Sequence, residues 1–251
     1  MNDMGMEPGV GLEIDIRKTL RSGARRFDLD IQLHSASRRI VIFGPSGAGK
    51  SLTLKAIAGL LRPDSGSIRL GGVTLFDSQA GIDLTPQARK VGYLFQDYAL
   101  FPHLTVRQNI ASALSSGWRN PARNFHHESV EYWLAAFHLE PLAHQYPNEL
   151  SGGQRQRTAL ARALVAHPRA LLLDEPFAAL DPALRVRMRA ELDELQRRLD
   201  VPMILITHDP DDVAAFGEHV ISLGGGRVDE RPFSRVAEEN AENEETALLT
   251  A

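Results

Sequence analysis

The sequence predicts an α/β fold with a parallel-sheet core, an antiparallel β part and an inserted helical part. Residues 12–33 alternate between apolar and polar side chains, which is typical of half-buried antiparallel strands. Short apolar runs at 39–43, 170–173 and 203–207 have the length of buried parallel strands. Between about residues 99 and 166 strand signals vanish, and apolar residues recur at helical spacing. We therefore expect one large domain with a helical insertion.

The first part of the chain predicts a hairpin, a buried strand and a helix, in that order. The alternating pattern breaks near Ser22-Gly23, which predicts a turn between two strands. Arg39–Phe43 is a short run rich in β-branched residues and predicts a buried strand. A helix is expected from Lys50 to about Leu61, and a turn at Pro63–Gly66.

The rest of the chain predicts further strands, one long helix and a tail. The amphipathic segment Leu184–Leu199 predicts a helix with many Arg and Glu residues. Residues 231–251 form an acidic tail whose composition is typical of disordered segments. The further strands are expected at Ser67–Leu70, Val91–Leu94, Ala170–Leu173 and Met203–Thr207.

The composition excludes several classes of protein. With 251 residues, 43% of them hydrophobic and 24% charged, the chain has ordinary globular values. No apolar run approaches the roughly 18 residues of a membrane-spanning helix, and no basic region precedes an apolar stretch at the N-terminus, so neither a span nor a secretion signal is expected. The absence of cysteine excludes a disulfide scaffold and a thiolate metal site. The net charge of −4 gives no indication of nucleic-acid binding.

A glycine-rich loop carries the strongest chemical signal. Residues Gly44–Ser51, GPSGAGKS, match G-x-x-x-x-G-K-[ST] between a predicted strand and a predicted helix. The glycines allow backbone N–H groups to surround phosphate oxygens, and the helix N-terminus adds partial positive charge. In such a loop Lys50 reaches the β- and γ-phosphates, and the Ser51 hydroxyl binds Mg²⁺. The full pattern in this context disfavours a glycine-rich turn that binds no ligand.

Two adjacent carboxylates, Asp174 and Glu175, follow a buried strand. Open α/β sheets bind ligands at the carboxyl ends of their strands, so we expect both acids beside the phosphate loop. If the extended backbone continues, their side chains point opposite ways, which suits Asp174 for Mg²⁺ and Glu175 for an attacking water. Alone, the motif is equally consistent with an exposed turn after a core strand.

Three further features are ambiguous when taken singly. The segment LSGGQ at 150–154 predicts a helix capped by Ser151, with two glycines that cost about 1 kcal/mol each relative to alanine. Either a backbone contact with an anion or a loose first helical turn explains them. His208 follows a strand and can bind phosphate, orient a water or serve a structural role. Gln96 ends the strand Val91–Phe95, and its amide can bind a metal-coordinated water.

Together these motifs resemble the nucleotide-binding subunit of ATP-binding cassette (ABC) transporters. The resemblance runs from about residue 12 to residue 230. It implies one ATPase domain over residues 1–230, with a phosphate-loop NTPase core, an antiparallel β subdomain and a helical subdomain inserted at about 97–166. The LSGGQ signature separates this family from other phosphate-loop ATPases. Six elements occur in the family order: Gly44–Ser51, Gln96, Leu150–Gln154, Leu171–Pro176, Ala179–Asp181 and His208.

The resemblance implies ATP and Mg²⁺ as cofactors, and a head-to-tail dimer that sandwiches two ATP molecules. Each ATP would lie between one chain's phosphate loop and the other chain's signature. Glu175 would act as general base, His208 would support the γ-phosphate and the water, and Asp181 would communicate across the dimer. The implied nucleotide contacts are Gly44, Pro45, Ser46, Gly47, Ala48, Gly49, Lys50, Ser51, Leu52, Ser151, Gly152, Gly153, Gln154 and Asp181. The implied metal ligands are Ser51, Gln96 and Asp174, and the implied catalytic residues are Glu175, His208, Lys50 and Gln96.

The adenine contact departs from the family pattern. The family stacks adenine on an aromatic side chain upstream of the phosphate loop, where this chain has LRSGARRFDLD. Phe27 is the only aromatic residue there, and Arg25 or Arg26 could stack instead. The contact stays open among these three residues, and weaker nucleobase discrimination is expected.

The segment Val91–Ile110 is similar to importers that work with a substrate-binding protein. The segments Gly81–Gly92 and Thr74–Ser78 are most similar to molybdate-importer ATPases, and importers for sulfate, ferric iron and polyamines share much of the pattern. The resemblance implies integral membrane permease subunits as partners, a substrate-binding protein indirectly, and a place at the cytoplasmic face of the inner membrane. Tyr98–Leu104 would either receive a coupling helix of the permease or belong to the core. A soluble non-transport ABC protein and a nucleotide-binding module without turnover are the alternatives. Because only about twenty residues follow residue 230, a bare cassette without a further C-terminal β-domain is expected.

Overall fold

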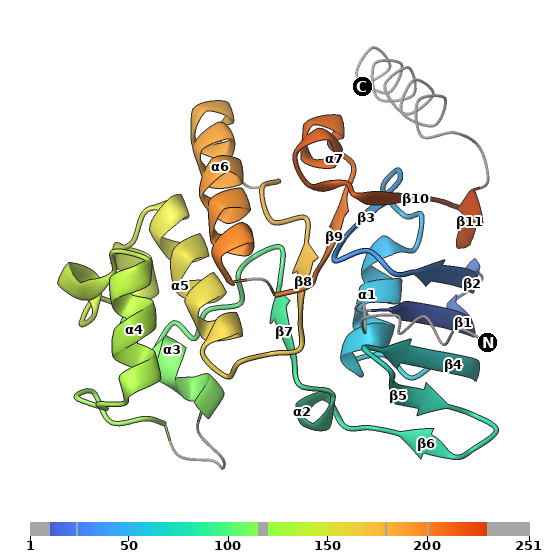
Figure 1. The fold of residues 1–251 in the computed structure, drawn as a ribbon, viewed down its shortest axis with the longest axis horizontal. Helices are drawn as coiled ribbons and strands as arrows, with labels where there is room; N and C mark the ends of the chain where they lie inside the picture. Colours follow the sequence, from blue (N-terminus) through green and yellow to red (C-terminus); the bar gives the residue numbers. More distant parts are fainter. Residues whose placement is uncertain (1–10, 24, 115–119, 179, 200, 230–251) are drawn as a thin grey trace, which may run out of the picture. The chain divides into compact units, whose positions relative to one another are not determined.

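The chain folds into two compact units, both of mixed α/β structure (Figure 1). The computed structural model describes residues 11–23, 25–114, 120–178, 180–199 and 201–229. The first unit contains the residues up to Arg89 and those from Pro202 onward, and the second contains Lys90–Val201. The predicted α/β class is therefore confirmed. The tail 231–251 and Ala179 of the Ala179–Asp181 motif lie outside the described residues.

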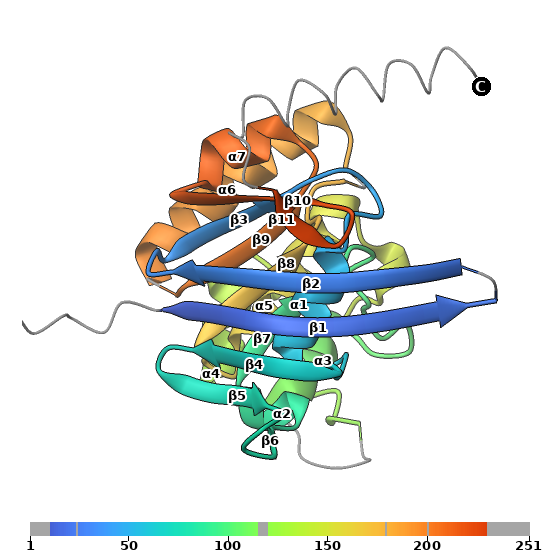
Figure 2. The ribbon, with the colours of Figure 1, turned by 90° about the vertical axis from the view of Figure 1, so that its right-hand side faces the viewer.

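The predicted hairpin belongs to an antiparallel part of the first unit's sheet. Its two long strands pair along their full length and lie side by side in Figure 2. In the first of them Leu12, Ile14 and Ile16 are buried and alternate with exposed charged residues, so one face of the sheet belongs to the core. In spatial order this part consists of β6 (Ile82–Asp83), β5 (Val73–Asp77), β4 (Ser65–Leu70), β1 (Leu12–Ser22) and β2 (Arg25–Ser35).

Parallel strands form the other part of the same sheet. The strand β3 (Arg39–Phe43) pairs with β9 (Met203–Thr207) on one side and with β10 (His219–Gly224) on the other. Phe43 lies opposite Thr207. Residues that follow β3 and β9 therefore leave the sheet at the same edge. The last strand, β11 (Arg227–Asp229), runs antiparallel to β10 and pairs with β2 at Arg227 and Asp30.

The described part of the first unit contains three helices: α1 (Lys50–Ala58), α2 (Pro86–Arg89) and α7 (Pro210–Phe216). The helix α1 ends three residues before the predicted Leu61 because Gly59 adopts a left-handed φ of +78°. The Gly59 N–H donates to Ala56 O at 3.2 Å, and the Leu60 N–H donates to Lys55 O at 2.9 Å. These bonds satisfy the last helical carbonyls and reverse the chain.

The second unit combines two parallel strands with helices. Among its described residues, 97–169 contain helices and turns and no strand, as the spacing predicts. The strands are β7 (Val91–Leu94) and β8 (Ala170–Asp174). The helices are α3 (Val106–Ala111), α4 (Glu128–Ala136), α5 (Gly152–Leu164) and α6 (Pro182–Leu199), with 3₁₀ turns at Ser112–Leu114, Glu140–Leu142 and Pro147–Glu149.

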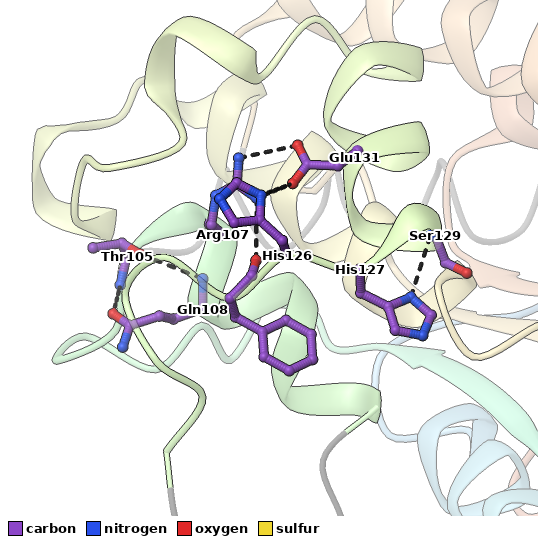
Figure 3. Close-up of polar contacts among 8 residues, drawn as sticks. Thr105, Arg107, Gln108, His126, His127, Ser129 and Glu131 are labelled. Carbon is purple, nitrogen blue, oxygen red and sulfur yellow. Dashed lines mark hydrogen bonds and ion pairs between the residues drawn. The ribbon is translucent and has the colours of Figure 1, made fainter.

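A polar cluster joins α3 to α4 (Figure 3). The buried Arg107 guanidinium pairs with both carboxylate oxygens of Glu131 and donates to Phe125 O at 3.2 Å. Hydrogen bonding from Arg107, and to a smaller degree from His126, lowers the pKa of Glu131. His127 caps α4 by accepting the Ser129 N–H at Nδ1, at 3.2 Å. A half-buried charge pair thus connects α3 to α4.

None of the helices in the described ranges is both long enough and apolar enough to cross a membrane.

Candidate functional site

The glycine-rich loop connects β3 to α1 in a conformation that its glycines make possible. The Gly44 N–H donates to Thr207 O at 3.3 Å, and a Cβ at Gly44 would lie 2.3 Å from Leu223 O. Gly47 and Gly49 have φ values of +80° and +101°, which favour glycine. The nine-residue α1 begins directly after Gly49. The loop therefore leads into a helix N-terminus, where N–H groups and partial positive charge favour an anion.

Lys50 adds a full positive charge to this loop. Its side chain is only 4% exposed, and Nζ donates to Gly44 O at 2.6 Å and to Pro45 O at 3.1 Å. The ammonium therefore reaches back over the loop from the first turn of α1. Ser51 is the next residue of α1 and is half-buried. An ammonium among backbone donors suits a polyphosphate ligand.

His208 follows β9, so its predicted place at a strand end is confirmed. The Thr207 hydroxyl before it donates to Asp212 Oδ2 at 2.6 Å and accepts the Asp209 N–H at 3.0 Å. The Asp209 side chain in turn caps α7. The backbone on both sides of the half-buried His208 is thus held at the edge where the phosphate loop leaves β3.

Asp174 and Gln96 follow neighbouring parallel strands of the second unit. Asp174 ends β8 and is 5% exposed. Gln96 is exposed and lies two residues beyond β7, which ends at Leu94 and does not include Phe95. The Tyr93 hydroxyl donates to Asp174 Oδ2 at 2.8 Å. Burial, and next the Asp174 charge, raise the pKa of Tyr93 far above its ordinary value, so the phenol keeps its proton. Tyr93 therefore fixes one carboxylate oxygen of Asp174.

Glu175 leaves the strand in a strained conformation. Its φ is +46°, in the left-handed region, and its carbonyl accepts the Ala178 N–H at 3.2 Å. The extended backbone therefore ends at Asp174. The expectation that the Asp174 and Glu175 side chains point opposite ways required extended backbone at Glu175, so that requirement is not met. A non-glycine residue held there costs about 1–3 kcal/mol, and such strain clusters at functional sites.

The signature segment begins α5 with a complete capping box. Ser151 Oγ accepts the Gln154 N–H at 3.3 Å, and Gln154 Oε1 accepts the Ser151 N–H at 2.8 Å. The first turn of α5 is therefore closed by two side-chain hydrogen bonds. A Cβ at Gly153 would lie 3.3 Å from Leu184 Cδ1 of α6, so close helix packing is a reason for this glycine that sequence reasoning missed.

Asp181 lies at the N-terminus of α6. Its Oδ1 accepts the Leu184 N–H at 3.0 Å, and its carbonyl accepts the Arg185 N–H at 2.9 Å. The helix begins at Pro182, two residues before the predicted Leu184, because Asp181 supplies the cap.

The three candidates for the adenine contact have different surroundings. The Phe27 ring is half-buried, and its Cζ would lie 3.3 Å from a Cβ at Gly49 and 3.2 Å from a Cβ at Gly226. Arg26 forms an ion pair with Asp28 at 2.8 Å. Arg25 is exposed. Phe27 is thus the candidate that packs beside the phosphate loop.

The predicted metal donors are a serine hydroxyl, an amide and a carboxylate, all oxygen donors of the type that Mg²⁺ prefers. Among the described residues no group of three or more His, Cys, Asp or Glu side chains is placed to hold a metal ion. Magnesium is usually held by one or two carboxylates and substrate phosphates, so this donor set fits it. The phosphate loop and His208 belong to the first unit, and Gln96, Asp174, Glu175, the signature and Asp181 belong to the second.

The ABC transporter family model matches residues 28–178. A molybdenum import ATP-binding protein ModC from Paramagnetospirillum magneticum is 41% identical over 220 residues, which are 86% of this chain and 58% of that protein. A sulfate/thiosulfate import ATP-binding protein CysA from Synechocystis is 42% identical over 80% of this chain and 55% of its own. The probable sulfate/thiosulfate counterpart from Chlorella vulgaris is 43% identical, over 74% of this chain and 76% of that protein. The chain thus spans little more than half the length of the first two relatives.

Solved structures of an ATP-binding cassette also match this chain. A dimeric post-hydrolysis state of the ATP-binding cassette MJ0796, bound to ADP and Pi, matches with a TM-score of 0.70 and 29% identity over 88% of this chain and 97% of that one. Another dimeric structure of MJ0796 matches with a TM-score of 0.71 and 28% identity.

Proposed function

Because this chain belongs to the ABC transporter family, we propose that it is the ATP-hydrolysing subunit of an oxyanion importer, with molybdate as the solute. The observation that carries the ATPase proposal is the signature Leu150–Gln154 at the capped N-terminus of α5, in the same chain as a phosphate loop at the N-terminus of α1. Relatives named for molybdenum and for sulfate or thiosulfate import support the oxyanion class.

The phosphate loop binds the ATP phosphates. Residues 44–52 surround the oxygens, with backbone N–H groups that follow Pro45 as donors, and Lys50 exchanges its bonds to Gly44 O and Pro45 O for the β- and γ-phosphates. When bound, Mg²⁺ neutralises charge on the phosphates. Ser51, Gln96 and Asp174 are its proposed ligands, and Tyr93 orients the Asp174 carboxylate through its hydrogen bond to Oδ2.

Hydrolysis needs a positioned water and stabilised charge more than covalent chemistry. Glu175 accepts a proton from the attacking water, and His208 donates a hydrogen bond to the γ-phosphate and aligns the water. The strained backbone at Glu175 serves to present its carboxylate at the end of β8.

The second copy of the chain completes each site. Ser151, Gly152, Gly153 and Gln154 of one copy bind the γ-phosphate held by the other, and Asp181 links the two sites. The MJ0796 cassette, which this chain resembles, is dimeric in both structures, and this supports the arrangement.

Permease subunits are the proposed membrane partners, and a substrate-binding protein acts through them. Phe101 is 43% exposed beside the buried Tyr98 and Leu104, so the segment Tyr98–Leu104 combines a core anchor with an exposed aromatic side chain. We place the chain at the cytoplasmic face of the membrane, where the exposed Phe101 faces the permease.

The variant Glu175→Gln tests the ATPase proposal. We expect it to bind ATP, to hydrolyse it very slowly and to accumulate as an ATP-bound dimer, because the amide cannot accept the proton. Turnover and molar mass with ATP are measured for the purified chain. An unchanged hydrolysis rate would falsify the role of Glu175, and a wild-type chain that binds ATP without turnover would favour the nucleotide-binding module.

Solute stimulation tests the importer proposal. The chain is co-purified with its membrane subunits, and ATP hydrolysis is measured with binding protein and molybdate, sulfate, ferric iron or a polyamine. We expect stimulation by molybdate. Stimulation by sulfate alone would favour the second candidate, a sulfate importer, which the CysA relatives support. Co-purification with ribosomes or DNA instead would indicate a non-transport ABC protein.

A further inference from the structure

The turn that follows Gln96 has an unusual backbone. Tyr98 and Ala99 are consecutive residues with φ values of +63° and +42°, although neither is glycine. The Tyr98 N–H closes the turn on Phe95 O at 2.9 Å, and the Ala99 N–H donates to Asp97 Oδ1 at 3.2 Å. Side chains with a Cβ disfavour left-handed backbone, so an interaction from elsewhere has to hold this turn.

That interaction comes from Arg162, near the C-terminal end of the signature helix α5. Its Nη2 donates to Tyr98 O and its Nη1 donates to Ala99 O, both at 2.7 Å. The planar guanidinium thus binds both strained residues with one rigid fork. Its Cζ also lies 5.4 Å from the centre of the Phe101 ring, within cation–π range.

The charge of Arg162 is retained at this half-buried place. Burial lowers its pKa from a very high ordinary value, and Asp97 opposes that shift. The other end of the same loop is held independently, because the buried Asn109 side chain of α3 bonds the Phe101 N–H, Phe101 O and Leu104 O at 2.8–3.1 Å. Side chains of α3 and α5 therefore both hold the loop by hydrogen bonds. Arg162 of α5 binds the half of the loop that continues from Gln96.

We propose that Arg162 is a positioning residue that ties the signature helix α5 to the 96–101 turn and so fixes the place of Gln96. The residue contacts backbone carbonyls and a ring, and it acts on the reaction only through Gln96. A shift of α5, which begins at the signature, then moves the turn as well. The kinetic part of this inference rests on the proposed ATPase function, whereas the structural part does not.

Hydrogen exchange tests the structural part. In the full chain, Arg162→Gln is expected to speed exchange of amides in a peptide covering 96–104 by about tenfold or more, because two charge-assisted hydrogen bonds are lost. Arg162→Lys should give an intermediate rate, because its single ammonium lacks the fork. The matched control is Arg157→Gln, which removes another arginine of α5 whose guanidinium pairs with Glu191. It should leave this peptide unchanged.

A double-mutant cycle separates positioning from general stabilisation. Ala99→Gly removes the Cβ that disfavours the left-handed turn. In the double variant, the logarithm of the exchange rate in 96–104 should therefore return at least halfway from the Arg162→Gln value to the wild-type value. Additive effects, unchanged exchange in 96–104 or equal acceleration throughout α5 and β8 would overturn the proposal.

ATP hydrolysis tests the kinetic part. Arg162→Gln should lower kcat about tenfold with little change in KM for ATP, and Ala99→Gly should recover part of the loss, since the phosphate loop is untouched. Wild-type kcat in a variant with a loosened turn would refute the link to Gln96. A wild-type chain without hydrolysis would contradict the proposed function, and the exchange cycle would still decide the role of Arg162.

Discussion

The hydroxyl of Tyr93 predicts a measurable effect on magnesium use. Groups that orient a metal ligand typically change metal affinity or activity by about 10–100-fold when removed. Tyr93→Phe removes the 2.8 Å bond to Asp174 Oδ2, so we expect the Mg²⁺ concentration for half-maximal ATP hydrolysis to rise by about tenfold. The matched control is Tyr132→Phe, because Tyr132 is 51% exposed. Equal Mg²⁺ dependence in both variants would show that Tyr93 only fills space.

The Phe27 side chain predicts an effect on nucleotide binding. Its ring packs beside Gly49 and Gly226, so it supports the phosphate loop. We expect Phe27→Ala to weaken ATP and GTP binding by the same factor, as measured by titration with both nucleotides. A selective loss of ATP affinity would instead assign adenine stacking to Phe27, and the expected weak nucleobase discrimination would be wrong.

Among the elements, the signature helix has a cap whose structural and functional roles can be separated. Ser151→Ala removes one half of the capping box and should lower the free energy of unfolding by about 1 kcal/mol. Ser151→Asp keeps a good N-cap but places a carboxylate where the γ-phosphate is proposed to bind. It should therefore retain the melting temperature and lose ATP-dependent dimer formation, measured by light scattering. Dimers formed by the Asp variant would contradict the contact of Ser151 with phosphate.

The helix α1 depends on Arg89 at its other end. The guanidinium is fully buried and donates to Ala56 O at 2.6 Å, Ile57 O at 3.0 Å and Leu84 O at 2.8 Å. It also forms an ion pair with Asp83 at 3.1 Å. The exposed Arg62 forms a second ion pair with Asp83, at 3.3 Å.

Replacing these two arginines compares a buried with an exposed interaction. Arg89→Met leaves the buried carbonyls without donors and should cost roughly 3 kcal/mol in urea unfolding. Arg62→Gln removes only an exposed ion pair and should cost less than about 1 kcal/mol. Similar costs for both variants would mean that Asp83, and not the end of α1, is the important partner.

At the scale of the whole molecule, local patterns predict some parts and not others. The strands β3, β7 and β9 lie where their apolar runs predict, and the phosphate loop forms between β3 and α1. The short strands β5, β6, β10 and β11 were not predicted. β10 and β11 pair with β3 and β2 across long sequence distances, as Arg227 pairs with Asp30. β5 and β6 pair with strands next to them in the sequence, but β6 has only two residues, too few for an alternating pattern.

The same reason limits prediction of the site. Motifs place Lys50, Asp174 and Ser151, because their chemistry depends on adjacent residues. The hydrogen bond between Tyr93 and Asp174 spans 81 positions, and that between Arg162 and Tyr98 spans 64. Neither side chain stands out in the sequence, since a tyrosine in a strand and an arginine on a helix are common in any chain.

The proposed head-to-tail dimer predicts complementation between two inactive chains. Lys50→Ala disables a chain's own phosphate loop, and Ser151→Asp disables the signature that the chain offers to its partner, so each homodimer contains two defective sites. In a mixed dimer the intact loop of one chain meets the intact signature of the other. An equimolar mixture should therefore regain ATP hydrolysis, at no more than about half of the wild-type rate, because each mixed dimer has one intact site of two. If loop and signature of the same chain formed the site, every chain in the mixture would be defective and no activity would return.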